Sequence, residues 1–141
     1  QSNLAGYRAG LAAGDPALLN SLLLARKHLG LIMPAPIQGA VATTLAEDQH
    51  VQEQRGRYHS RRELIFPALR AAGFRIDHSE AGLYAWASRD EECWSSVSWF
   101  SERGILVAPG SFYGQAGQHH IRVALTATDA ACEAAASRLR A

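Results

Sequence analysis

Helices packed against a sheet, in an α/β or α+β fold, are predicted by three features of the sequence. Helical and strand-like segments alternate from residue 74 to residue 139, which is typical of helices that cover a sheet. Glycine and proline breaks at 14–16 and 33–36 separate the earlier helical segments. Hydrophobic residues make up 48% of the 141 residues, enough for a packed core, and this length favours a single domain by default.

A short strand and two helices are predicted in the first third of the chain. The strand is expected over residues 4–12. Asp15 can cap the first helix and Pro16 suits its first turn, while Gly30 ends it. Leucines give this helix one apolar face, which is interpreted as core packing: Leu18, Leu19, Leu22, Leu23 and Leu29.

The second helix is expected over residues 36–46 and the third over residues 48–72. The second consists mainly of small residues, which allow another backbone to approach closely. Pro67 should kink the third helix or mark a turn near its end. Its apolar residues mark a buried side: Val51, Tyr58, Leu64, Ile65 and Leu69. Its charged residues are interpreted as a solvated face: Arg55, Arg57, Arg61, Arg62 and Glu63.

The rest of the chain alternates between strands and helices. Residues 105–108 contain no polar side chain, so that strand is expected to be buried, and Gly104 ends the helix before it. Thr128 and Asp129 are expected to cap the last helix. The predicted strands are 74–77, 82–87, 105–108 and 121–126, and the predicted helices are 91–103 and 128–139.

Charge and cysteine content narrow the classes of function. The net charge of +1 gives no electrostatic footprint for nucleic acid or an anionic membrane, and no run approaches the ~20 apolar residues of a membrane span. Cys93 and Cys132 stand far apart, so buried free thiols in a reducing, cytoplasmic compartment are expected. His119 and His120 have no carboxylate or cysteine at metal-ligand spacing, so no metal site is expected.

Arg8 is the first candidate for ligand binding. It stands among small and apolar residues, so its guanidinium is expected to be partly buried and to need an anionic partner. Gly6 and Gly10 would let a backbone or a ligand approach closely. The residues alone leave open whether the partner is a carboxylate of the fold or a bound anion.

Residues 3–10, Asn-Leu-Ala-Gly-Tyr-Arg-Ala-Gly, resemble a segment of the class I and II aminotransferases, the fold-type I pyridoxal-phosphate (PLP) enzymes. In that family a Ser-Lys pair is followed by variable residues and then Gly-aromatic-Arg-x-Gly, with the cofactor-binding lysine eight positions before the arginine. The resemblance implies that Arg8 binds the cofactor phosphate through two charge-assisted bonds. It also implies that the chain begins just after that lysine, so that it contains no catalytic residue and is inactive alone.

Arg122 is the second candidate, because it interrupts an otherwise apolar strand. From the residues alone, an ion pair within the fold and a ligand contact stay open. Seven residues separate residues 109–114, Pro-Gly-Ser-Phe-Tyr-Gly, from Arg122, as in the aminotransferase pattern, and residues 82–86 also match a family strand. The resemblance implies that Arg122 binds the substrate α-carboxylate and that Phe112 contacts the substrate.

The resemblance covers essentially the whole chain and implies an organisation for it. Residues 1–45 would be the tail of the large PLP-binding domain and residues 46–141 the small C-terminal domain. The small residues of 36–46 would lie at the interface of a homodimer. Residues 104–114 look most like succinyldiaminopimelate aminotransferases of lysine and diaminopimelate biosynthesis, with glutamate as amino donor. A distal acidic group of the substrate would then meet Ser111, Tyr113 or Gln115.

Two alternatives remain at this point. The chain could belong to another fold-type I PLP enzyme, namely a decarboxylase, a lyase or an acyl-CoA condensing enzyme. It could instead be a non-catalytic α/β ligand-binding module that keeps the carboxylate-binding arginine.

Overall fold

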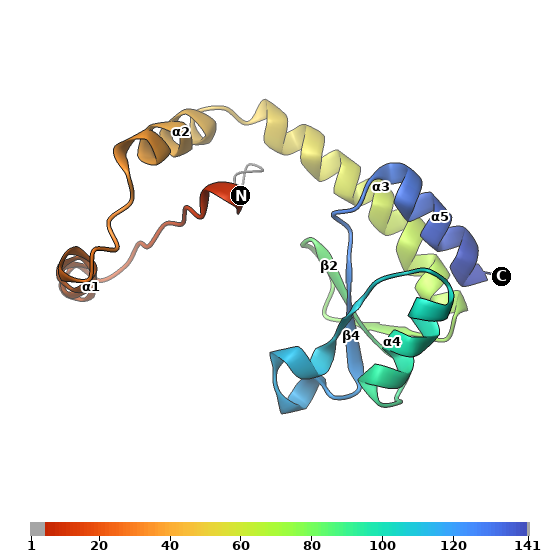
Figure 1. Cartoon of the computed structure of the whole chain (residues 1–141). Helices are drawn as coiled ribbons and strands as arrows, with labels where there is room; N and C mark the ends of the chain where they lie inside the picture. Colours follow the sequence, from red (N-terminus) through yellow and green to blue (C-terminus); the bar gives the residue numbers. More distant parts are fainter. Residues whose placement is uncertain (1–4, 141) are drawn as a thin grey trace. The chain divides into compact units, whose positions relative to one another are not determined.

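The computed structural model describes residues 5–140, which fall into two compact units with the boundary between Gln54 and Arg55 (Figure 1). The first unit contains a short 3₁₀ turn, η1 (Ala5–Tyr7), and the helices α1 (Pro16–His28) and α2 (Ala35–Leu45). The long helix α3 (Gln49–Ala71) begins in the first unit and continues into the second. No described helix has the length and apolar character that would let it cross a membrane.

The start of the first unit differs from the prediction. Within the described part of residues 4–12 the chain forms η1 and then irregular backbone, so the predicted strand is wrong; Leu4 lies outside the described residues. A strand needs a neighbour to accept its ladder hydrogen bonds, and the sheet contains only strands after residue 74. The prediction for α1 is confirmed at its start, where the Asp15 carboxylate accepts a hydrogen bond from the Leu18 N–H at 3.0 Å.

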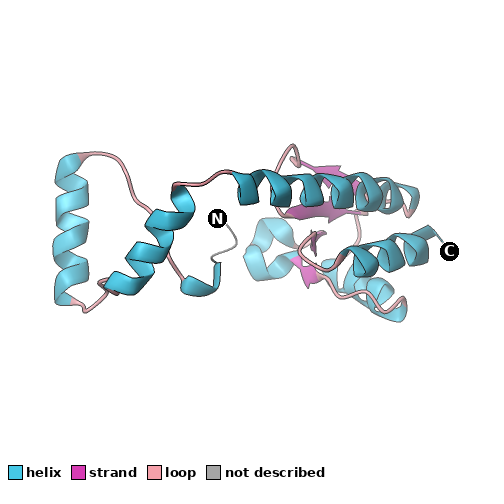
Figure 2. Ribbon diagram, turned by 90° about the horizontal axis from the view of Figure 1, so that it is seen from above, coloured by secondary structure: helices cyan, strands magenta, loops and turns pink. Residues whose placement is uncertain are grey.

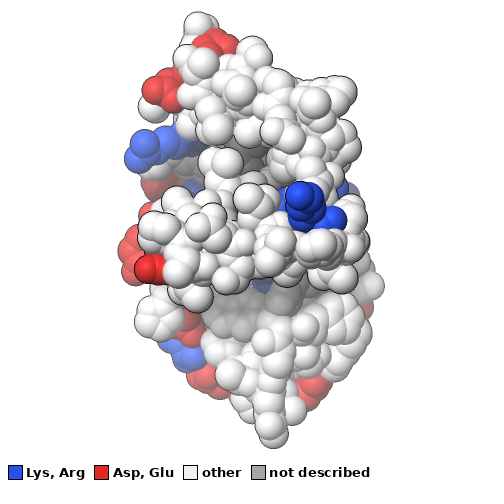
Figure 3. All heavy atoms as spheres, turned by 90° about the vertical axis from the view of Figure 1, so that its left-hand side faces the viewer, with Lys and Arg blue, Asp and Glu red and all other residues white. Residues whose placement is uncertain are grey.

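The leucines of α1 are largely exposed. The prediction that they pack into a core is wrong for this chain, since Leu18 is 72% exposed and no residue of α1 or α2 is buried. The periodicity made the helix amphipathic, but no described element of its unit covers the apolar face. Charged atoms are few on the face of the molecule drawn in Figure 3.

The second unit has one sheet with helices on one face (Figures 1 and 2). Its strands pair antiparallel in the order β1-β2-β4-β3, and α4 (Cys93–Glu102) and α5 (Asp129–Arg140) complete it with the second half of α3. The strands are β1 (Arg75–Asp77), β2 (Tyr84–Ser88), β3 (Ala108–Pro109) and β4 (His120–Ala124). The predicted fold class, in which helices pack against a sheet, is therefore confirmed.

The core of the second unit lies between the sheet and its helices. Alternate residues of β2 and β4 point into it, since successive side chains of a strand face opposite sides. The buried apolar residues include Leu69 and Ile65 of α3, Phe100 of α4, Leu139 of α5, and Ala85, Ala87, Ile121 and Val123 of the strands.

The long helix buries only its second half, where Ile65, Phe66, Ala68 and Leu69 are buried, whereas Val51 is exposed. Pro67 lies inside α3 and does not end it. The interpretation of the arginines as a wholly solvated face is wrong for two of them. Arg61 pairs with Asp129 at 2.6 Å, and Arg62 donates to the carbonyl oxygens of Ser79 and Gly82.

The predicted buried strand at 105–108 is also wrong in part. Only Ala108 and Pro109 form β3, and Leu106 is 97% exposed. The Ile105 N–H donates to the Phe100 carbonyl oxygen at 3.0 Å, after Gly104 has turned into the left-handed region at φ 64°. Ile105 thus belongs to the C-terminal cap of α4, although the apolar run 105–108 predicted a strand there.

Candidate functional site

Arg122 lies on the sheet face that points away from the core. Its neighbours on β4, Ile121 and Val123, are buried, so Arg122 projects from the opposite face. Trp86 of β2 stands directly opposite Arg122 in the antiparallel register, and Ala108 of β3 stands on its other side. Arg122 therefore sits on a central strand of the sheet, where its backbone is held by both neighbours.

Two tyrosines flank the Arg122 guanidinium. Its central carbon lies 4.2 Å from the ring centroid of Tyr84 and 5.0 Å from that of Tyr113, which is cation–π geometry. No ion pair joins Arg122 to a carboxylate within residues 5–140, and its buried Nε has no hydrogen-bond partner there. Such a guanidinium retains its capacity to donate to an added anion.

A glycine-rich loop carries Tyr113 to this face. A 3₁₀ turn, η2 (Gly110–Tyr113), and another, η3 (Gln115–Gly117), connect β3 to β4. A Cβ on Gly110 would collide with the Gly117 carbonyl oxygen, and one on Gly117 would collide with the Gly110 carbonyl oxygen. Only glycine fits this mutual contact, which holds the loop against the start of β4.

Phe112, the predicted substrate contact, is 69% exposed on the same loop. Its ring meets that of Trp94 on α4 edge-on, at 5.8 Å between centroids. Phe112 therefore points to a neighbour other than Arg122, although Tyr113 beside it covers Arg122. Its assignment to substrate binding stays a prediction.

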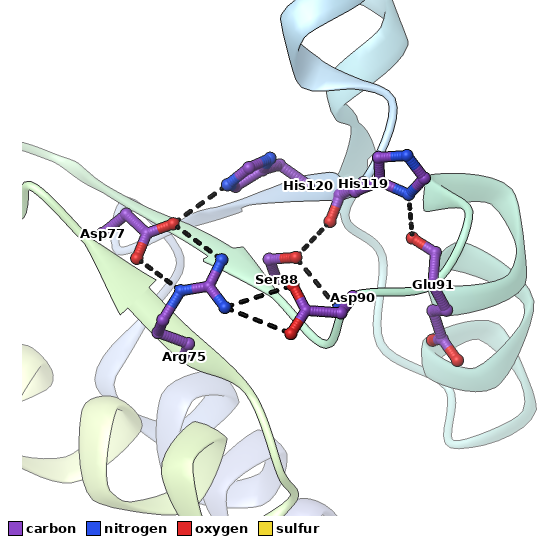
Figure 4. A network of polar contacts seen from close by, with 7 residues as sticks. All are labelled: Arg75, Asp77, Ser88, Asp90, Glu91, His119 and His120. Carbon is purple, nitrogen blue, oxygen red and sulfur yellow. Dashed lines mark hydrogen bonds and ion pairs between the residues drawn. The ribbon is translucent and has the colours of Figure 1, made fainter.

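A polar network borders the Arg122 face (Figure 4). Arg75 on β1 pairs with Asp77 at 2.9 Å and with Asp90 at 3.1 Å, and the second Asp77 oxygen lies 3.0 Å from His120 Nε2. The hydrogen bond from Arg75, and then the one from His120, holds the pKa of the Asp77 carboxyl below its ordinary value. Asp77 is thus kept ionised beside His120.

Arg8, the predicted phosphate ligand, lies in the first unit. The expectation that it is partly buried is wrong for this chain, because the side chain is exposed and its nearest polar contact is the Ala5 carbonyl oxygen at 3.5 Å. No ion pair holds Arg8 within the described residues. Arg8 also has φ 56°, a left-handed conformation unusual for a residue with a side chain.

Sequence reasoning missed several residues of the Arg122 face, namely Tyr84, Trp86, Asp77 and His120. The signal that could have found them is alternation: Tyr84 and Trp86 flank the small, buried Ala85, and His120 and Arg122 flank the buried Ile121. Among residues 5–140, no group of three histidine, cysteine or acidic side chains is arranged to hold a metal ion.

Two relatives are similar over nearly the whole chain. A "4-dedimethylamino-4-oxo-anhydrotetracycline transaminase" of Streptomyces rimosus is 55% identical over 139 residues, which are 99% of this chain and 39% of that protein. A "probable aminotransferase" of Mycobacterium tuberculosis is 54% identical over 138 residues, which are 98% of this chain and 33% of that protein. The chain thus spans between a third and two fifths of the length of these relatives.

The fold is shared with a solved structure, the N-succinyldiaminopimelate aminotransferase of Mycobacterium tuberculosis. The TM-score is 0.81 at 23% identity, over 98% of this chain and 38% of that one. The family described as aminotransferase class I and II, whose enzymes depend on PLP, matches residues 1–139. The chain belongs to the class I and II aminotransferases.

Proposed function

We propose that the full-length protein is a PLP-dependent aminotransferase that transfers an amino group from glutamate to a keto acid. The observation that carries this proposal is the Arg122 guanidinium, which two tyrosines flank and which no acid of the described residues neutralises. This arrangement favours a ligand-binding role for Arg122 over a structural ion pair, and the similarity to class I and II aminotransferases favours an aminotransferase over a non-catalytic ligand-binding module.

Arg122 binds the α-carboxylate of the amino acid and of the keto acid in this proposal. A planar guanidinium can make two parallel bonds to a carboxylate, and that pairing fixes the direction of the bonds at the substrate Cα. The rings of Tyr84 and Tyr113 on the guanidinium limit its rotation. The contribution of this chain to the reaction is therefore binding and orientation.

Arg8 would hold the phosphate of PLP. The exposed guanidinium has no acidic partner in the described part of the chain and can offer a fork of donors to phosphate oxygens. Bound PLP supplies an electron sink for the bonds at the substrate Cα. We further propose that residues 1–45 belong to the PLP-binding domain and residues 46–141 to the small domain.

The substrate we propose is N-succinyl-2-amino-6-ketopimelate, which would place the protein in lysine and diaminopimelate biosynthesis. The likeness of residues 104–114 to succinyldiaminopimelate aminotransferases supports it, as does the fold shared with the N-succinyldiaminopimelate aminotransferase of Mycobacterium tuberculosis. Ser111, Tyr113 and Gln115 lie on the loop beside Arg122 and are the candidates to meet a distal acidic group.

A planar polycyclic ketone is the second candidate substrate. The Streptomyces rimosus relative is named for an oxo-anhydrotetracycline, and aromatic side chains are exposed around Arg122. Tyr84, Tyr113 and Phe112 could stack on such a ligand.

We also propose that the protein is a cytoplasmic homodimer. Cys93 and Cys132 are both free and buried, which supports a reducing compartment. The small residues of α2, among them Gly39, Ala40 and Ala42, support close approach of a second subunit.

The test uses the full-length, PLP-loaded protein and its Arg122→Lys variant. Lysine keeps the positive charge but lacks the parallel N–H donors of the guanidinium. We therefore expect kcat/KM to fall by about a hundredfold for both the amino donor and the keto acid while PLP stays bound. Unchanged kinetics for both substrates would disprove the role of Arg122.

The same protein decides between the substrates. We expect kcat/KM to be highest with the succinylated keto acid in a comparison with oxaloacetate, pyruvate, an aromatic keto acid and the oxo-anhydrotetracycline. A preference for the tetracyclic ketone would replace the first substrate by the second. Failure of all five with PLP bound would favour another fold-type I reaction.

A further inference from the structure

The Arg122 guanidinium is the end of a continuous series of contacts across the sheet. Tyr113 covers the guanidinium, and the ring of Trp86 meets Tyr113 edge-on at 5.7 Å between centroids and 80° between planes. The ring of His120 stacks on Trp86, at 5.1 Å and 8°. Each ring in the series is thus fixed by the next in a geometry that aromatic pairs prefer.

Strand register explains why these residues meet. Asp77, Trp86 and Arg122 are cross-strand partners in one row over β1, β2 and β4. His120 precedes Arg122 by two residues, so it lies on the same face and diagonally next to Trp86. From that position His120 reaches both the Trp86 ring and the Asp77 carboxylate.

Charged groups fix the far end of the series. His120 Nε2 lies 3.0 Å from Asp77, and Asp77 is held in turn by Arg75 at 2.9 Å. His120 Nδ1 is buried and has no partner among the described residues, so Asp77 is the one polar contact that orients this ring there. An imidazole fixed in this way gives Trp86 a rigid surface to stack on.

We propose that Trp86 and His120 are positioning residues for Arg122, acting through Tyr113. The series of rings sets the plane in which the guanidinium presents its free edge to a carboxylate ligand. This inference rests on the proposed role of Arg122. Neither positioning residue touches the ligand, and their effect is on the affinity of the carboxylate and not on the bonds that react.

The first experiment separates binding from chemistry in the full-length, PLP-loaded protein. Trp86→Leu should raise KM for the amino donor and the keto acid by about tenfold and change kcat by less than about threefold. The Kd of glutarate, which has carboxylates but no amino or keto group, should rise by the same factor in calorimetric titration. Trp86→Phe keeps a ring against Tyr113 and should restore KM and Kd to within about twofold.

Trp99→Leu is the matched control. Trp99 is also half-buried, but it packs on Phe74, Phe100 and Arg103, away from the Arg122 face. Its loss should lower the Tm and leave the glutarate Kd unchanged. If Trp99→Leu raises the glutarate Kd as much as Trp86→Leu does, the weaker binding in Trp86→Leu reflects general destabilisation of the fold and the proposal is wrong.

A double-mutant cycle tests the order of the series. His120→Gln can keep a hydrogen bond to Asp77 but loses the stacked ring. It should therefore weaken glutarate binding when introduced into the wild type and have no further effect on the glutarate Kd in the Trp86→Leu background. Additive effects would overturn the proposal, because His120 would then act independently of Trp86.

Arg122→Lys distinguishes this inference from the proposed function. If glutarate binds Arg122→Lys as tightly as the wild type, the proposed function fails. If Arg122→Lys weakens glutarate binding and Trp86→Leu does not, Arg122 binds the ligand and the proposed positioning role of Trp86 and His120 is refuted.

Discussion

The two units of the chain differ in what surrounds their candidate arginines. In the second unit a sheet and three helices enclose a core, and Arg122 stands on a central strand between two aromatic rings. In the first unit no residue of α1 or α2 is buried, and among the described residues the Arg8 side chain donates only to the Ala5 carbonyl oxygen of its own turn. The difference teaches that a packed sheet fixes the surroundings of Arg122 from several elements, which the described residues do not do for Arg8.

The comparison can be sharpened most strongly by truncating one leucine in each unit. Leu69 is fully buried, so Leu69→Ala should lower the free energy of unfolding of the 141-residue chain by about 2–5 kcal/mol. Leu18 in α1 is 72% exposed, so Leu18→Ala should change it by less than about 0.5 kcal/mol. Urea unfolding followed by circular dichroism measures both. Equal losses would mean that α1 is packed in solution.

A smaller effect is expected when the Arg8 side chain is removed. It would show that the first unit contributes to binding of the cofactor, whereas Arg122 of the second unit is proposed to bind the substrate. Arg8→Ala in the full-length protein should weaken PLP retention by about tenfold, because the charge-assisted bonds to the phosphate that we propose for Arg8 would be lost. Loss of cofactor absorbance on dialysis measures this, with Arg26→Ala as the control, since Arg26 donates to the Leu31 carbonyl oxygen in the same unit. Wild-type retention by Arg8→Ala would assign Arg8 a structural role.

The smallest effect concerns the pH dependence of the second unit. Since the pKa of Asp77 is lowered in the folded state, its contribution to stability is present above the ordinary carboxyl pKa and is lost as pH falls through the lowered value. Asp77→Asn should therefore lower stability at pH 7 and flatten its decline below about pH 4.

Asp90→Asn is the control for that prediction. Asp90 also pairs with Arg75, but its side chain is 76% exposed, so its removal should change the pH profile less. Urea unfolding at a series of pH values compares the two variants. A decline for Asp77→Asn as steep as that of the wild type would show that Asp77 does not stabilise the fold.

Local signals determined most helices and the class of fold. The Asp15 cap, the proline at the start of α1 and the apolar periodicity of α3 act within one or two turns, so the sequence alone contains them. Arg122 could also be identified as a candidate from the sequence alone, because a charged residue within an apolar strand can be recognised without knowing its partner. The alternation in β2 and β4 is also visible in the sequence, although no core residue of these two strands was predicted from it.

Tertiary contacts decided the rest, because they join residues far apart in the sequence. Arg61 meets Asp129 and His120 meets Asp77 only once the sheet and helices have assembled. The same assembly leaves Leu106 exposed beside the end of α4, although its apolar neighbours predicted a buried strand. The sequence determined that Arg122 needs a partner. The strand register decided that Tyr84 lies diagonally beside it, and the loop between β3 and β4 brings Tyr113 to it, because such neighbours are set by tertiary pairing and not by order along the chain.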